Sequence, residues 1–296
     1  MPIARLRFPA SLACAVGLSS LLFPHQMLAA STSFEATATS PASPQRSIRD
    51  WVVLATNNEV AALTHEGSFL RYRMHVVNQK GDRLRDVVES KDGTVARTLM
   101  ENGKPLSPEA DQAERKRLEG LAASASEFAK HVKDDVSGKK LATDLIRLMP
   151  EAMIYTPAPG MADAHSPYGT RLIVFDFEPN PKWNPPSTTS EALTGLRGRV
   201  WIDSSSGFVT RLDGEIFRSV NIGWGMLAHV YPGGKLSFEQ VNVGNNRWIY
   251  SHFADQARVR ALMLKTLDVS VEITASNFQP LPGPLTFQQA IALLLR

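Results

Sequence analysis

Seven histidines and a scattered set of carboxylates are the residues of this chain that could carry catalysis or hold a metal. His65-Glu66 is not followed by a second histidine four residues later, so the zinc-protease spacing is missing. There is no glycine-flanked serine elbow, no phosphate-binding loop and no dinucleotide glycine fingerprint. The one cysteine, Cys14, permits neither a disulfide framework nor a cysteine metal site. We therefore expect no metal and no cofactor.

Three groups of polar residues are candidates for general acid, general base or nucleophilic roles. They are Asp203 with Asp213 on either side of a predicted hairpin, His229 with His252 on neighbouring predicted strands, and Asp163, His165 and Ser166 in one loop. A triad needs a geometry that adjacency in sequence does not supply. Turn carboxylates and solvated or core histidines explain all three groups more simply, so a hydrolase is only a remote alternative.

The stronger chemical signal is apolar. Methionine and aromatic side chains make adaptable walls for apolar ligands. Eight apolar positions on predicted sheet faces, six of them aromatic or methionine, are the candidate lining of a cleft: Tyr72, Met74, Phe175, Phe177, Phe208, Leu212, Met263 and Leu267. The competing interpretation is that these side chains simply fill a packed core.

These positions depend on segments with a period of two, the alternation of a two-faced β-strand. In residues 196–222, Val200 and Ile202 alternate with Arg199 and Trp201, and a serine-rich turn leads to a second alternating strand. Three similar segments follow: a hairpin at 226–243, and strands at 247–258 and 259–275. In the last of these, Met263 is expected to share a face with Leu267.

Upstream, residues 69–78, 82–90 and 94–100 predict a meander with turns at Lys80-Gly81 and Asp92-Gly93. An amphipathic helix is expected over 49–66. Ser107 and Pro108 mark the start of another helix, which runs to about residue 135 and is followed by a further helix over 139–149. A buried strand is expected at 171–178, and a stiff proline-rich loop at 180–190.

Taken together, these elements predict an α+β fold: a strongly curved antiparallel sheet of about ten strands with helices covering its concave face. The expected organisation is a signal peptide at 1–30, a flexible linker at 31–48, one domain at 49–280 with a helical insertion near 105–150, and a tail at 281–296 that forms a short helix.

The first 30 residues carry the signal features of Arg5, Arg7 and an apolar run, with cleavage expected after Ala30. The run is shorter than a spanning helix needs, so no transmembrane segment is expected after its removal and the protein should be periplasmic or otherwise secreted. Without Arg5 and Arg7, the 32 basic residues fall to 30 against 29 acidic ones, and no basic face is clustered. A nucleic-acid partner is not expected.

Three segments carry a family resemblance: GRVWIDSSSGFVTRLDGEIF at 198–217, residues 223–253 and residues 261–278. With residues 90–118, they resemble secreted bacterial proteins of the outer-membrane lipoprotein-sorting type, relatives of the carrier LolA and the receptor LolB. The resemblance implies a half-barrel whose cavity takes lipoprotein acyl chains. The helical insertion at 105–150 and the proline-rich loop at 180–190 depart from those carriers.

The sequence therefore predicts a non-enzymatic cell-envelope protein that binds a lipid or a lipoprotein acyl group. The alternative is a structural or interaction module, with another envelope protein as partner, whose apolar face is fully packed. An open apolar cavity of roughly 300 Å³ or more would distinguish the two.

Overall fold

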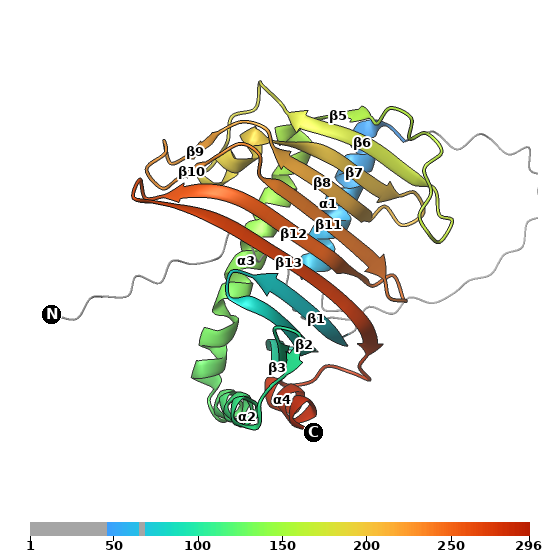
Figure 1. Ribbon diagram of the computed structural model, residues 1–296. Coiled ribbons are helices and arrows are strands. Elements are labelled where there is room, and N and C mark those ends of the chain that lie inside the picture. The colour runs from blue at the N-terminus through green and yellow to red at the C-terminus, as the bar shows by residue number, and fades with distance from the viewer. Residues whose placement is uncertain (1–45, 65–68) are drawn as a thin grey trace, which may run out of the picture.

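The computed structural model describes residues 46–64 and 69–296, and these form an α+β fold around one antiparallel sheet (Figure 1). The expected signal peptide, the cleavage site after Ala30 and almost all of the expected linker lie outside the described residues. The strands are β1 Leu70–Asn78, β2 Gly81–Ser90, β3 Gly93–Glu101, β4 Lys104–Pro105, β5 Met153–Pro157, β6 Leu172–Pro179, β7 Leu196–Asp203, β8 Val209–Ile216, β9 Val220–Ile222, β10 Ala228–Val230, β11 Lys235–Asn242, β12 Trp248–Ala261 and β13 Lys265–Pro280.

The sheet is open, and its order is β4-β3-β2-β1-β13-β12-β11-β8-β7-β6-β5, with β9 and β10 attached beside β12. An open antiparallel sheet was expected and is confirmed. The 13 strands exceed the expected ten or so because β4, β9 and β10 are too short to show alternation. The N-terminal meander and the C-terminal one meet where β1 pairs with β13, for example Val76 with Ile273.

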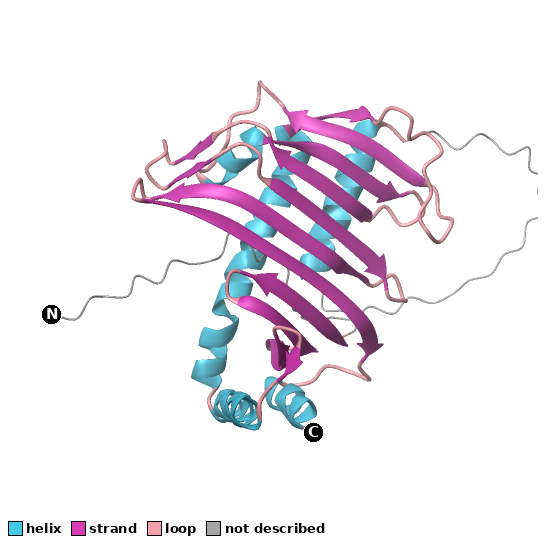
Figure 2. Cartoon of the chain, in the orientation of Figure 1, coloured by secondary structure: helices cyan, strands magenta, loops and turns pink. Residues whose placement is uncertain are grey.

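Four α-helices and one 3₁₀ helix accompany the sheet in the described part of the chain: α1 Ile48–Thr64, α2 Pro108–Ala123, α3 Ala125–Ala152, η1 Thr189–Gly195 and α4 Phe287–Leu295. Figure 2 shows α1 and α3 lying across the same face of the sheet, which we call the inner face. The other face of β6–β8 and β11 carries ion pairs such as Arg199–Asp176 and Arg211–Glu239. Its polar character explains why the helices leave this part of the outer face uncovered.

The helical insertion is divided differently from the prediction. Its first helix starts as expected, because the Ser107 side chain accepts a hydrogen bond from the Ala110 amide. It then ends at Ala123, and α3 continues without a break to Ala152. The Ser124 hydroxyl accepts a hydrogen bond from the Glu127 amide and so caps α3. Ser124-x-x-Glu127 is a capping-box spacing that locates this boundary in the sequence.

The expected hairpin at 226–243 is wrong. Strands β10 and β11 do not pair with each other; both pair with β12, as successive pieces of one interrupted strand. Hydrogen bonds from the Gly233 amide to the Ile216 carbonyl, and from the Ile216 amide to the Gly234 carbonyl, hold the Pro232-Gly233-Gly234 segment against β8. The segment therefore bends a strand instead of reversing it.

The C-terminal residues are part of the domain. Helix α4 packs its buried Phe287, Ile291 and Leu294 against Val88 and Leu118. The Lys91 amide donates to the Leu285 carbonyl, and Arg97 Nη1 donates to the Leu294 carbonyl. The tail thus closes the end of the sheet at β2 and β3 (Figure 1).

We predict that alanine at Gly198 destabilises the fold. Gly198 lies opposite Gly214 and beside Phe177, and a Cβ atom there would overlap the Asp213 carbonyl oxygen and lie 2.9 Å from the Phe177 ring. Overpacking of this kind costs about 1–3 kcal/mol. Urea unfolding of Gly198→Ala should show a loss in that range.

Gly120→Ala is the matched control. Gly120 lies in α2, and a Cβ atom added there would meet no neighbouring atom within 4 Å, so alanine should stabilise the helix by about 0.8–1 kcal/mol. Equal stability of Gly198→Ala and the wild-type protein would contradict this account of the β7–β8 contact.

Candidate functional site

A cavity of about 520 Å³ lies between α1, α3 and the inner face of the sheet. Its size is within the range of small-molecule sites. Apolar side chains make up most of the wall. They include Val52, Ala55 and Leu63 from α1, Leu141, Ala142, Leu145, Ile146 and Met149 from α3, and Val200, Ile202, Val209, Leu212, Phe238, Phe253, Ala257 and Val259 from the strands.

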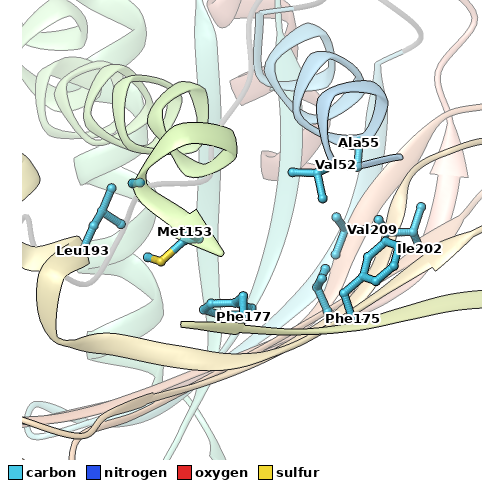
Figure 3. Packing of buried hydrophobic residues seen from close by; sticks show 10 residues of the cluster. Val52, Ala55, Met153, Phe175, Phe177, Leu193, Ile202 and Val209 are labelled. Carbon is cyan, nitrogen blue, oxygen red and sulfur yellow. The ribbon is translucent and has the colours of Figure 1, made fainter. Parts of the chain in front are cut away.

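The cavity is bordered on one side by a packed cluster. Figure 3 shows Val52 and Ala55 of α1 facing Val209 and Ile202 of the sheet. Both α1 residues are buried, with exposed fractions of 5% and 4%, so this part of α1 packs directly on the sheet. Farther along, α3 contacts α1, η1 and β5, and side chains of α3 and of the middle strands line a common space. The space between them is the cavity.

The eight predicted cleft residues are divided between cavity, core and surface. Phe177 and Leu212 line the cavity. Phe175 is buried in the neighbouring cluster, and Phe208 is buried with its ring stacked on Trp248 at 5.4 Å. These four residues are thus at or next to the cavity.

The other four predicted residues lie elsewhere. Tyr72 and Met74 of β1 belong to a second hydrophobic cluster. In it the Tyr250 hydroxyl donates a hydrogen bond to Met74 Sδ at 3.3 Å. Leu267 lies in β13 opposite Val259 and is not part of the cavity wall. The expectation for Met263 is wrong: it is 64% exposed in the turn between β12 and β13, with φ of 59°, because the strand begins only at Lys265.

A β-bulge in β12 affects which of its side chains reach the cavity. Glu239 pairs with His252 and Gln240 with Tyr250, so Ser251 is an extra residue in β12. The bulge shifts the alternation by one position. Trp248 and Tyr250 therefore line the cavity together with Phe253.

Glu59 joins α1 to the sheet within the cavity wall. Its Oε1 accepts hydrogen bonds from the Val209 amide at 2.9 Å and from Gln240 Nε2 at 2.7 Å. Burial raises the pKa of Glu59 to about 7, against the opposing effect of these two donors. Burial also raises the pKa of Asp255, another wall residue, to about 6. The pKa values of two carboxyl groups in the cavity wall are thus raised toward neutrality.

A buried ion pair lies where the cavity meets the second cluster. Arg247 Nη2 is 3.3 Å from Glu89 Oε1, and both side chains are nearly inaccessible. Glu89 Oε2 also accepts a hydrogen bond from the Leu70 amide at 3.0 Å. Burial raises the pKa of Glu89 and Arg247 opposes that rise, while burial lowers the pKa of nearby Lys139 to about 8. Arg247 lines the cavity, and its Nε has no hydrogen-bond partner among the described residues.

The carboxylates that could have served in hydrolysis are engaged in local contacts. Asp203 Oδ1 accepts hydrogen bonds from the Ser205 and Ser206 amides, which lower its pKa although burial opposes them. Asp213 pairs with Arg211 at 2.7 Å. Asp203 therefore shapes the turn between β7 and β8, and Asp213 belongs to the polar outer face.

The histidine groups do not assemble either. His229 contacts Asn221 and pairs across the sheet with Arg260, whereas His252 lies 3.4 Å from Glu272. In the loop after β5, His165 Nδ1 lies 2.8 Å from the backbone carbonyl of Asp163, and the Ser166 hydroxyl accepts from the Thr170 amide. Within residues 46–64 and 69–296, no three His, Cys, Asp or Glu side chains are grouped as metal ligands.

Comparisons with known proteins identify no relative: no family model, curated protein or solved structure matches the chain. The resemblance to lipoprotein-sorting proteins therefore stays a prediction. Among the described residues, none of the helices combines the length and apolarity needed to cross a bilayer.

We predict that Glu59 makes stability fall as the pH rises. The folded-state pKa of about 7 lies above the ordinary value of 4.5, so the folded protein holds more protons than the unfolded chain between these values. The stabilisation is present below pH 4.5 and is lost through pH 7. The loss is at most about 3 kcal/mol. Asp255 contributes in the same direction up to about pH 6.

Urea unfolding across this pH range checks the prediction. Glu59→Gln should flatten the dependence above pH 6 and should be more stable than the wild-type protein at pH 8, roughly the upper end of the titration. Glu178→Gln, at an exposed position of β6, is the control and should leave the slope unchanged. An unchanged slope in Glu59→Gln would contradict a buried, titrating Glu59.

Proposed function

We propose that the protein is a non-enzymatic cell-envelope protein that binds a lipid, or the acyl chain of a lipoprotein, in the cavity between α1, α3 and the inner face. The observation that carries this proposal is the 520 Å³ of space inside an apolar wall. Each buried methylene contributes about 0.8 kcal/mol, so an acyl chain is bound through its area without specific contacts.

The wall suits a flexible apolar chain. Its side chains come from two helices and from several strands of the sheet, and they include branched aliphatic, aromatic and thioether groups. Thioethers and unbranched chains adapt to ligands of different shape. Of the charged wall residues, Arg247 is paired with Glu89. Burial raises the pKa of Glu59 and of Asp255 and so favours the neutral forms of these two wall carboxyl groups beside an uncharged acyl chain.

The proposal includes the finer fold assignment and the location. An open antiparallel sheet with two helices over one face is the arrangement that the resemblance to LolA-type half-barrels implies. The signal features of residues 1–30 support export to the periplasm or outside the cell. In such a compartment, lipids and lipoproteins are the available acyl ligands.

A purely structural module with a packed core is the alternative, and a cavity of this size does not favour it. A hydrolase that used the acid, base or nucleophile groups expected from the sequence would need those groups at the cavity. Asp203, Asp213, His229 and His252 are absent from its wall. The acyl-binding proposal accounts for the space without requiring either.

Analysis of co-purifying lipid tests the proposal directly. The purified protein is extracted with organic solvent, the extract is examined by mass spectrometry, and binding of a fluorescent fatty acid is titrated. We expect a co-purifying lipid or saturable binding that long-chain fatty acids displace. A protein that carries no lipid and also fails to bind the fluorescent fatty acid would overturn the proposal.

We predict that Ala142→Phe reduces binding of the fluorescent fatty acid by roughly tenfold or more. The phenyl ring would fill cavity space that several methylene groups of the acyl chain would otherwise occupy. Ala142 lies on α3 in the cavity wall. Because the substitution fills a cavity, the free energy of unfolding should not fall. The measurement is a fluorescence titration together with a urea unfolding curve.

Ala129→Phe provides the matched control. It makes the same substitution at an exposed position of the same helix and should bind as the wild-type protein does. Equal loss in both variants would show that the cavity is not the binding site.

A further inference from the structure

Six exposed apolar side chains gather at one end of the sheet. They lie in two turns, 223–227 between β9 and β10 and 262–264 between β12 and β13, which we call the apolar tip. Of the eleven large hydrophobic residues exposed in the described part of the chain, these six are Trp224 at 88%, Leu264 at 87%, Met263 at 64%, Met226 at 56%, Leu227 at 54% and Leu262 at 41%. Single exposed hydrophobic residues are ordinary, but a group of this kind indicates an interaction surface.

Backbone pairing holds the two turns together. Strand β10 pairs with both β9 and β12, and Ala228 lies opposite Ala261. The Leu262 amide donates to the Leu227 carbonyl at 3.0 Å, directly joining one turn to the other. Figure 1 shows the β9–β10 turn and the end of the β12–β13 hairpin projecting from the same edge of the sheet. The tip is therefore one surface built from two segments.

The conformation of the turns keeps the side chains outward. Trp224, Leu262 and Met263 have φ of 54°, 48° and 59°, values that bulky residues rarely adopt. Such backbone strain persists only where the surrounding structure imposes it. Here the paired strands impose it, and bulky apolar groups occupy positions where glycine or asparagine would be less strained.

The charge around the tip is basic. Residues 216–234 and 256–267 contain no aspartate or glutamate, whereas they contain Arg218, Arg258, Arg260 and Lys265. The nearest carboxylates lie at the base: Glu191 accepts a hydrogen bond from the Gly223 amide, and Asp268 lies 3.6 Å from Arg258. An apolar surface with a basic border suits an anionic lipid surface.

The tip adjoins the cavity. Ile222, Val230 and Val259, near the ends of β9, β10 and β12, line the cavity wall. The two turns follow within a few residues of Ile222 and Val259. The tip therefore begins within a few residues of the cavity wall.

We propose that the apolar tip docks the protein on the surface of an anionic phospholipid bilayer, inserting Trp224 and Leu264 at the headgroup level while Lys265 and Arg258 contact the headgroups. Tryptophan favours this interfacial depth. Docking goes beyond the proposed ligand cavity and does not depend on it. If both hold, the docked tip places one end of the cavity at the source of its ligand.

Vesicle binding by the mature protein, which begins at Ser31 after the expected cleavage, tests the proposal. Sedimentation is measured with phosphatidylcholine vesicles that contain roughly one third phosphatidylglycerol, and with phosphatidylcholine alone. We expect binding to the anionic vesicles that weakens as salt is raised. The double variant Trp224→Asn/Leu264→Ser should bind roughly tenfold more weakly, and Lys265→Glu should lose most of the preference for anionic lipid.

Tyr168→Ser is the matched control, because Tyr168 is 85% exposed in the loop between β5 and β6 and lies outside the tip. It should bind vesicles as the wild-type protein does. A second readout is the tryptophan fluorescence of the tip. Subtracting the spectrum of Trp224→Asn from that of the wild-type protein isolates the emission of Trp224. This emission should shift to the blue on vesicles and be quenched by brominated lipid. Unchanged Trp224 emission, or equal binding by the double variant, would overturn the proposal.

The two proposals fail separately. The double variant should retain fluorescent fatty acid binding, and Ala142→Phe should retain vesicle binding. A tip variant that changes the oligomeric state while vesicle binding is unaffected would assign the tip to a protein contact and overturn membrane docking.

Discussion

The inner face of the sheet offers more apolar surface than two helices can cover, and the rest of the structure depends on this constraint. Helix α1 is seated on the sheet through Val52 and Ala55, and α3 reaches the sheet mainly at β5. Protein interiors normally close such gaps to crystal-like density. The space that persists between α3 and the central strands is the cavity in which we propose that a ligand binds.

Buried polar groups hold the covering helices and strands in place around that space. Glu59 connects α1 to β8 and to β11, and Glu89 with Arg247 connects β2 to the start of β12. Buried charges of this kind add little net stability, but they specify one arrangement, because any other would leave a charge unpaired. These interactions thus position the helices and strands around the cavity and add little to the free energy of folding.

Interruptions in two strands determine the shape of the structure where the cavity adjoins the apolar tip. The bend at Pro232-Gly233-Gly234 separates β11 from β10, and residues 217–219 separate β8 from β9. Both breaks occur at the same level of the sheet, so two paired strands turn together and carry the apolar tip beyond the main sheet. The strands that carry the tip consequently also supply residues of the cavity wall.

By itself the sequence determined the local elements, because alternation and capping act over a few residues. Val200 and Ile202 mark the inner face of β7, and Ser107 marks the start of α2, as expected. Only the tertiary structure decided which apolar residues line space and which fill it. Phe177 lines the cavity and Tyr72 does not, since that difference depends on where α3 crosses a sheet assembled from distant segments. The single extra residue Ser251 is likewise a change of register that only the pairing with β11 reveals.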